Sequence, residues 1–160
     1  MTTIVCNSEE GYMAADRMAT SNDCDVATEY PKIRVVQKSD GVHLLATSGH
    51  EASGQIFEEW YELEYDEGEE YKMLEPLEDM EEIDKFTTVI LKPNREIWIA
   101  DHFYRPYRVH SPVYCTGTGG PFAWAVIRAG CTIEKAMSVA IDMDPNSGFG
   151  YDIEYLDEYE

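Results

Sequence analysis

Three pairs of short apolar runs, each pair joined by turn-forming residues, constrain the fold of this chain more than any other feature of its sequence. The runs are rich in β-branched and aromatic residues, and Gly, Asp, Asn and Pro lie between them, a pattern typical of β-hairpins. Strands joined by tight hairpins are antiparallel. The sequence therefore predicts antiparallel sheets, with strand pairs at 2–7 and 12–16, at 32–37 and 42–47, and at 86–91 and 96–100.

Helical patterns lie between and after these hairpins. Apolar and aromatic residues from 50 to about 65 fit one helical face, although Gly54 weakens the pattern. Pro121 can open a helix over 122–129, with Gly130 just past its end.

A last helix is predicted over 133–143, capped by Thr132 and ended before Pro145. Weaker strand patterns occur at 104–107, 113–116 and 151–155, and residues 21–30 read as a polar loop. Helices segregated from antiparallel strands predict an α+β fold with helices packed on sheets.

Size and charge limit both domain number and function. The 160 residues fit one domain, 1–160. The formal charge is 12 − 32 = −20, which would repel phosphate backbones and anionic lipids, so neither a nucleic-acid nor a membrane partner is expected. A protein that imitates DNA would tolerate this charge, and that alternative stays open.

The acidic residues concentrate in one variable segment at about 58–84, which has 14 Asp or Glu residues and one Lys. Like-charge repulsion, together with Gly68 and Pro76, disfavours a long regular helix there. The segment is interpreted as a solvated face or mobile loop, with a binding surface for a basic partner as the alternative.

No long apolar span and no basic-then-apolar leader occur in the sequence, so a soluble, cytoplasmic protein is expected. The cysteines lie far apart without a CxxC pair, which predicts reduced and mostly buried thiols rather than disulfides or a zinc site. The histidines lack ligand-like spacing, so no metal and no cofactor are expected. The cysteines are Cys6, Cys24, Cys115 and Cys131.

Four local features could carry chemistry. Thr2 becomes a terminal threonine if Met1 is removed, and its own α-amine could then act as base for its hydroxyl. Asp16 and Lys32 lie at strand ends, where they could meet across a sheet, or they could form a surface ion pair. The glycine-rich segment 115–121 reads as a turn of close backbone approach, and 144–148 as an ordinary turn.

These features follow the order found in a known family. The carriers of the resemblance are Thr2-Thr3-Ile4-Val5, Ala15-Asp16, Lys32-Ile33-Arg34, Ala46-Thr47-Ser48-Gly49, Thr116-Gly117-Thr118-Gly119-Gly120-Pro121-Phe122-Ala123 and Asp144-x-x-Ser147-Gly148. Together they resemble the proteasome β-subunit family, and within it the bacterial HslV-type threonine peptidases. The resemblance spans nearly the whole chain and implies the N-terminal nucleophile hydrolase fold, a four-layer αββα sandwich of antiparallel sheets.

The resemblance also implies roles for individual residues. Thr2 corresponds to the nucleophile, Asp16 and Lys32 to the ion pair beside it, and the Gly49 N–H to the oxyanion donor. The groups implied around the terminal amine and its water are Thr118, Asp144 and Ser147. The residues expected to line the substrate pocket are Tyr30, Arg34, Thr47 and Glu51.

The function implied is hydrolysis of peptide bonds through an acyl-enzyme on Thr2. Peptides or unfolded proteins are the expected substrates, a ring-like homo-oligomer the expected assembly, and an ATPase unfoldase a further expected partner. A second hypothesis keeps the fold and drops catalysis: a proteasome-like assembly or interaction module that uses its acidic surface.

Overall fold

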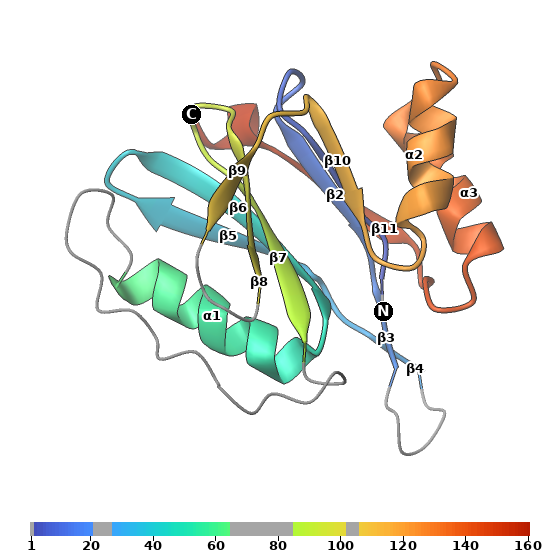
Figure 1. Cartoon of the computed structure of the whole chain (residues 1–160), viewed down its shortest axis with the longest axis horizontal. Coiled ribbons are helices and arrows are strands. Elements are labelled where there is room, and N and C mark those ends of the chain that lie inside the picture. The colour runs from blue at the N-terminus through green and yellow to red at the C-terminus, as the bar shows by residue number, and fades with distance from the viewer. Residues whose placement is uncertain (1, 21–26, 65–84, 102–105) are drawn as a thin grey trace.

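The computed structural model describes residues 2–20, 27–64, 85–101 and 106–160 (Figure 1). One sheet has four antiparallel strands in the order β10-β1-β2-β11. Its central pair, β1 and β2, is the first predicted hairpin, and the last two strand patterns supply its edges. The bounds are β1 (Ile4–Asn7), β2 (Tyr12–Asp16), β10 (Val113–Thr116) and β11 (Tyr151–Tyr155).

The second sheet has five antiparallel strands in chain order, β5-β6-β7-β8-β9. It contains the other two predicted hairpins. Its last strand begins only after Pro106, which has no N–H to donate to a ladder, and the predicted positions 104 and 105 lie outside the described residues. The bounds are β5 (Ile33–Lys38), β6 (Gly41–Gly49), β7 (Phe86–Leu91), β8 (Ile97–Asp101) and β9 (Tyr107–Val109).

A small two-stranded sheet corrects the prediction of a plain loop at 21–30. In it β4 (Ala27–Glu29) pairs antiparallel with β3 (Met18–Thr20). The three residues of β4 are exposed, so no buried face imposes an apolar pattern on them. Partners distant in the sequence anchor the ribbon instead: Arg17 pairs with Glu29 at 3.0 Å and with Asp152 at 2.7 Å.

The three predicted helices form close to their expected bounds, as α1 (Glu51–Glu64), α2 (Gly120–Arg128) and α3 (Ile133–Met143). Gly54, which weakens the helical pattern of α1, has a packing reason: a Cβ there would lie 2.2 Å from Thr47 Cγ2 of β6. Thr132 caps α3 by accepting the N–H of Lys135 at 3.2 Å. Residues 58–64 of the acidic segment end α1, and 65–84 lie outside the described residues.

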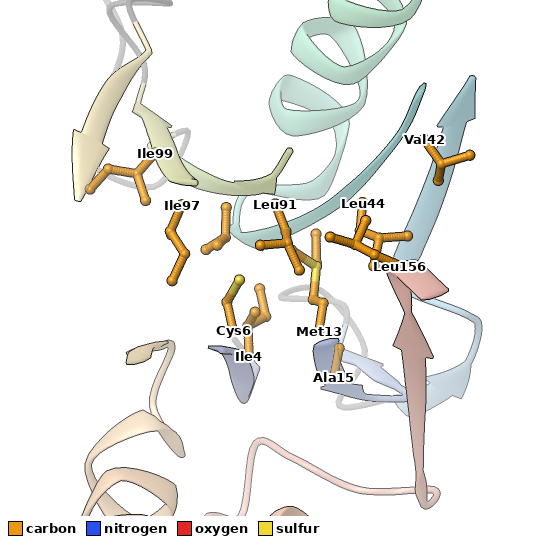
Figure 2. Close-up of a cluster of buried hydrophobic side chains, with 12 residues drawn as sticks. Ile4, Cys6, Met13, Ala15, Val42, Leu44, Leu91, Ile97, Ile99 and Leu156 are labelled. Atoms are coloured by element: carbon orange, nitrogen blue, oxygen red, sulfur yellow. The ribbon is translucent and has the colours of Figure 1, made fainter. Parts of the chain in front are cut away.

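Strand alternation divides the buried residues into three clusters. In the first, residues of β1 and β2 meet residues of the five-stranded sheet; Figure 2 shows Ile4, Cys6, Met13 and Ala15 facing Leu44, Leu91, Ile97 and Ile99. In the second, α1 packs Phe57, Trp60 and Tyr61 against that sheet's other face. In the third, α2 and α3 cover the opposite face of β1 and β2 (Figure 1).

Thiol burial departs in part from the expectation. Cys6 is buried and Cys115 half-buried, but Cys131 is exposed because it lies in the turn between α2 and α3. Cys24 lies outside the described residues. None of the helices in the described part of the chain is long and apolar enough to cross a membrane.

Candidate active site

The register of the first hairpin brings the start of the chain to the end of β2. Ile4 pairs with Ala15, so Thr3 lies opposite Asp16, and Asp16 N–H donates to the Thr3 carbonyl at 3.2 Å. Thr2 lies one residue beyond. Both threonines are buried, with 2% and 0% of their surface exposed.

The Asp16 carboxylate gathers three groups at one oxygen. Its Oδ1 accepts hydrogen bonds from Thr2 Oγ1 at 2.5 Å, from the Thr3 N–H at 3.0 Å and from Lys32 Nζ at 2.7 Å. Lys32 Nζ also donates to Thr2 Oγ1. The Thr2 hydroxyl is therefore held between an ammonium and a carboxylate, both of which are buried.

The other oxygen of Asp16 fixes the carboxylate to the backbone. Oδ2 accepts the N–H groups of Met18 and Gly148, each at 3.1 Å. With five donors around it, the carboxylate has a defined position, because each oxygen is satisfied by groups from separate parts of the fold.

Lys32 enters the site from the residue before β5. Burial lowers the pKa of Lys32 below its ordinary value, and the adjacent Asp16 carboxylate opposes part of that shift. The predicted meeting of Asp16 and Lys32 is thus a buried contact; the alternative of a surface ion pair is wrong.

A second network begins at Thr3 and ends at Asp144. Thr3 Oγ1 and Ser147 Oγ lie 2.8 Å apart, and Ser147 Oγ donates to Asp144 Oδ2 at 2.6 Å. Thr118 Oγ1 donates to the same oxygen at 2.7 Å. Burial alone would raise the pKa of Asp144, but these hydroxyls and the Asn146 N–H hold it below its ordinary value.

The glycine-rich segment before α2 provides the close approach that its sequence predicts. The Gly119 N–H donates to the Thr2 carbonyl at 3.3 Å. A Cβ at Gly117 would lie 1.9 Å from Thr2 O, and one at Gly119 would lie 1.8 Å from Thr3 Oγ1. Only glycine leaves room at these two positions for the start of the chain.

A cavity of about 290 Å³ opens beside Lys32, and all four residues predicted for the substrate pocket line it: Tyr30, Arg34, Thr47 and Glu51. The sequence interpretation missed Gln55, Glu58 and Glu59, which also line it. Their spacing from Glu51 places them on one face of α1, and that spacing could have identified them.

Gly49 ends β6 opposite Phe86 and has a φ of +102°. A Cβ there would lie 2.5 Å from the Lys85 carbonyl oxygen, so glycine allows the chain to turn into α1. Among the predicted site residues, all of which the structure describes, Gly49 is the one outside both networks and the pocket lining.

No protein-family model and no curated protein matches the sequence. Solved structures do match over nearly the whole chain. Eukaryotic HslV from Trypanosoma brucei is 19% identical with a TM-score of 0.62, and the match covers 96% of this chain and 98% of that one. BPH from Thiobacillus denitrificans is 17% identical with a TM-score of 0.62, covering 97% of each chain.

The Gly-1 mutant of Anbu from Hyphomicrobium sp. strain MC1 is 12% identical with a TM-score of 0.68, covering 100% of this chain and 84% of that one. BPH has also been solved in complex with epoxomicin. At such identities these matches establish the fold: the chain has the α+β, proteasome β-type fold that the sequence resemblance implies.

Proposed function

We propose that this protein is a threonine-nucleophile peptidase, with Thr2 as nucleophile once Met1 has been removed. The observation that carries the proposal is the position of the Thr2 hydroxyl, buried and in contact with both Lys32 Nζ and Asp16 Oδ1. A hydroxyl becomes a nucleophile when a base accepts its proton and a neighbouring charge stabilises the oxygen. The buried ammonium and carboxylate around the Thr2 hydroxyl favour this chemistry over a purely structural role for Thr2.

In the proposed first step, the free α-amine of Thr2 accepts the proton of its own hydroxyl, because its pKa of about 7.7–8.0 suits proton transfer near neutral pH. The Lys32 ammonium stabilises the negative charge that develops on Oγ1. Asp16 holds Lys32 in place and balances its charge in the buried site.

Oγ1 then bonds to the carbonyl carbon of the peptide, and the Gly49 N–H is proposed to bind the developing oxyanion. The C–N bond breaks, and the leaving amine takes the proton held by the α-amine. Water next attacks the ester between Thr2 and the acyl group, releases the acid and restores the hydroxyl.

Thr118, Asp144 and Ser147 are proposed to hold the terminal amine and its water. In support, the Asp144 carboxylate is kept ionised by the hydroxyls of the other two, and Ser147 reaches Thr3 next to the nucleophile. A negative charge near an amine favours its protonated form, as the second half of proton transfer requires.

Further features of the proposal come from the fold. The three buried clusters support the four-layer αββα arrangement. By analogy with the family that the sequence resembles, we propose peptides or unfolded proteins as substrates, a ring-like homo-oligomer, and an ATPase unfoldase as partner. A cytoplasmic setting fits the free thiols of Cys6, Cys115 and Cys131.

Intact mass before and after treatment with epoxomicin, the ligand in a BPH structure, tests the proposal. Loss of Met1 and one stoichiometric adduct on Thr2 are expected. Thr2→Ala should lose both the adduct and peptide hydrolysis, whereas Thr2→Ser keeps a hydroxyl and should keep the adduct. Thr28→Ala, the same truncation at an exposed residue of β4, should behave as the parent protein.

A folded protein that retains Met1, forms no adduct and hydrolyses no peptide would contradict the proposal. The second hypothesis, a non-catalytic module that binds a basic partner through its acidic surface, would then account for the fold. Neutralising acidic residues of 58–84 should in that case abolish partner binding.

A further inference from the structure

The cavity beside Lys32 has an unbalanced charge. Three carboxylates of α1, those of Glu51, Glu58 and Glu59, line it. The two cations among the described lining residues are both engaged: Lys32 with the buried Asp16, and Arg34 with Glu62, which does not line the cavity. The empty cavity therefore presents negative charge.

Glu58 indicates what the cavity would take. The residue is 7% exposed, and its Oε1 accepts a hydrogen bond from Thr47 Oγ1 at 2.6 Å. The same side chain lines the cavity. Burial raises the pKa of Glu58 above its ordinary value, and a cation bound in the cavity would favour the ionised carboxylate.

The cavity's position identifies which part of a peptide would enter it. Lys32 lines the cavity, and its Nζ contacts Thr2 Oγ1, so the carbonyl attacked by Thr2 lies at the cavity's edge. The substrate side chain nearest that carbonyl is the side chain of the residue that contains the carbonyl. A volume of about 290 Å³ is at the lower end of the range for ligand sites and suits a single side chain.

We infer that this cavity binds the Lys or Arg side chain of the residue whose carbonyl is attacked, which makes the protein a peptidase selective for cleavage after basic residues. The inference rests on the proposed function and names its substrate class. The long aliphatic stem of such a side chain packs beside Pro31 and Ile33 at the cavity wall. Its cationic end reaches the carboxylates of α1.

Arg34 is the residue that could favour an acidic side chain instead. Its guanidinium is held by Glu62 Oε2, and an incoming carboxylate would have to compete with that partner while facing Glu51, Glu58 and Glu59. In a partly desolvated pocket, repulsion between like charges strongly weakens the binding of an acidic side chain. The charge distribution therefore favours a basic side chain over an acidic one.

Three fluorogenic peptides that differ only in the residue before the scissile bond test the inference. We expect kcat/KM to fall in the order Arg, Leu, Glu, with about 10- to 100-fold between Arg and Leu. Glu58→Gln keeps an acceptor for Thr47 and removes the charge, so the Arg-to-Leu ratio should fall about 10-fold. Glu51→Gln, at an exposed position, should lower the same ratio and provides a second variant if Glu58→Gln fails to fold.

Glu134→Gln, an exposed residue in the first turn of α3, is the matched control and should leave the ratio unchanged. Hydrolysis with Leu or Glu preferred over Arg, together with an epoxomicin adduct on Thr2, would overturn the inference and leave the proposed function standing. No hydrolysis of any of the three peptides and no adduct would overturn both.

Discussion

At the scale of single residues, Asp16 connects the two parts of the candidate site. Its Oδ1 contacts Thr2 and Lys32, and its Oδ2 accepts the N–H of Gly148, the residue after Ser147 in the second network. The side chain is completely buried. One carboxylate therefore fixes both the nucleophile and the turn that carries the groups proposed to hold the terminal amine.

Lys32→Ala should reduce both hydrolysis and stability. Loss of the ammonium beside Oγ1 is expected to lower kcat about 10²- to 10⁴-fold, and the buried Asp16 left without its cation should cost about 3 kcal/mol of unfolding free energy. Peptide hydrolysis and urea unfolding measure the two effects. Lys32→Arg keeps the charge, so it should retain more stability than Lys32→Ala and still lose activity, because guanidinium does not reproduce the position of Nζ. Activity within twofold of the parent in Lys32→Ala would show that Lys32 is misassigned.

The lowered pKa of Asp144 predicts a specific dependence of stability on pH. Because its folded-state pKa lies below the unfolded value of about 3.9, the unfolded chain binds more protons in that range. The stabilisation from Asp144 is therefore complete above the unfolded value and is lost as pH falls through the folded value. Urea midpoints measured from pH 6 to pH 3 should fall less steeply in Asp144→Asn than in the parent. Parallel curves for the two proteins would contradict this assignment.

At the scale of elements, the start of α2 determines how closely the chain's beginning can approach the site. Gly119 precedes the helix and packs against Thr3. A Cβ at Gly120, which begins the helix, would have its nearest neighbour 3.4 Å away, on the backbone of Cys115. Two adjacent glycines thus differ in the space around them. The difference arises from tertiary packing, since their local sequences are alike.

Gly119→Ala should therefore displace Thr3 and slow epoxomicin labelling of Thr2 at least 10-fold. The added methyl group would lie 1.8 Å from Thr3 Oγ1, and such overpacking typically costs about 1–3 kcal/mol. Gly120→Ala is the matched control: its methyl group meets ordinary van der Waals contacts, and labelling and urea midpoint should stay near those of the parent. Equal labelling rates in the two variants would contradict the close approach described for Gly119.

Elements with strong local signals were predicted well. Gly130, expected just past the end of α2, has a φ of +87°, as that position requires. The strand β4 was missed because its exposed residues have no buried face to pattern them. Its pairing depends on Arg17, which reaches Glu29 and the distant Asp152, and a local pattern contains no information about that contact.

At the scale of the whole molecule, a net charge of −20 on 160 residues opposes compaction. Raising ionic strength from about 0.02 M to about 0.3 M shortens the screening length several-fold. The melting temperature should rise because salt screens the repulsion between like charges, by about 2–4 °C for each kcal/mol of repulsion relieved. The buried pair Lys32–Asp16 is screened little, so its loss should not offset this gain. Differential scanning calorimetry measures the shift. Sodium and potassium chloride should give equal shifts, and a melting temperature that falls with salt would contradict the expectation.

Features that depend on residues close together in the sequence are predictable from the sequence. Hairpin pairing, helix caps and the segregation of helices from strands follow from alternation, turn chemistry and the positions of Gly and Pro, and these led to the α+β fold. The resemblance to a known family implies that Thr2, Asp16 and Lys32 belong to one site.

Contacts between residues that are distant in the sequence depend on the tertiary structure. Thr3 and Ser147 are 144 positions apart and lie within hydrogen-bond distance, and Glu58, one of many glutamates in the sequence, lines the cavity beside Lys32. The physical reason is range: backbone preferences act over a few residues, whereas burial, charge compensation and close approach depend on groups that come together only when the two sheets pack.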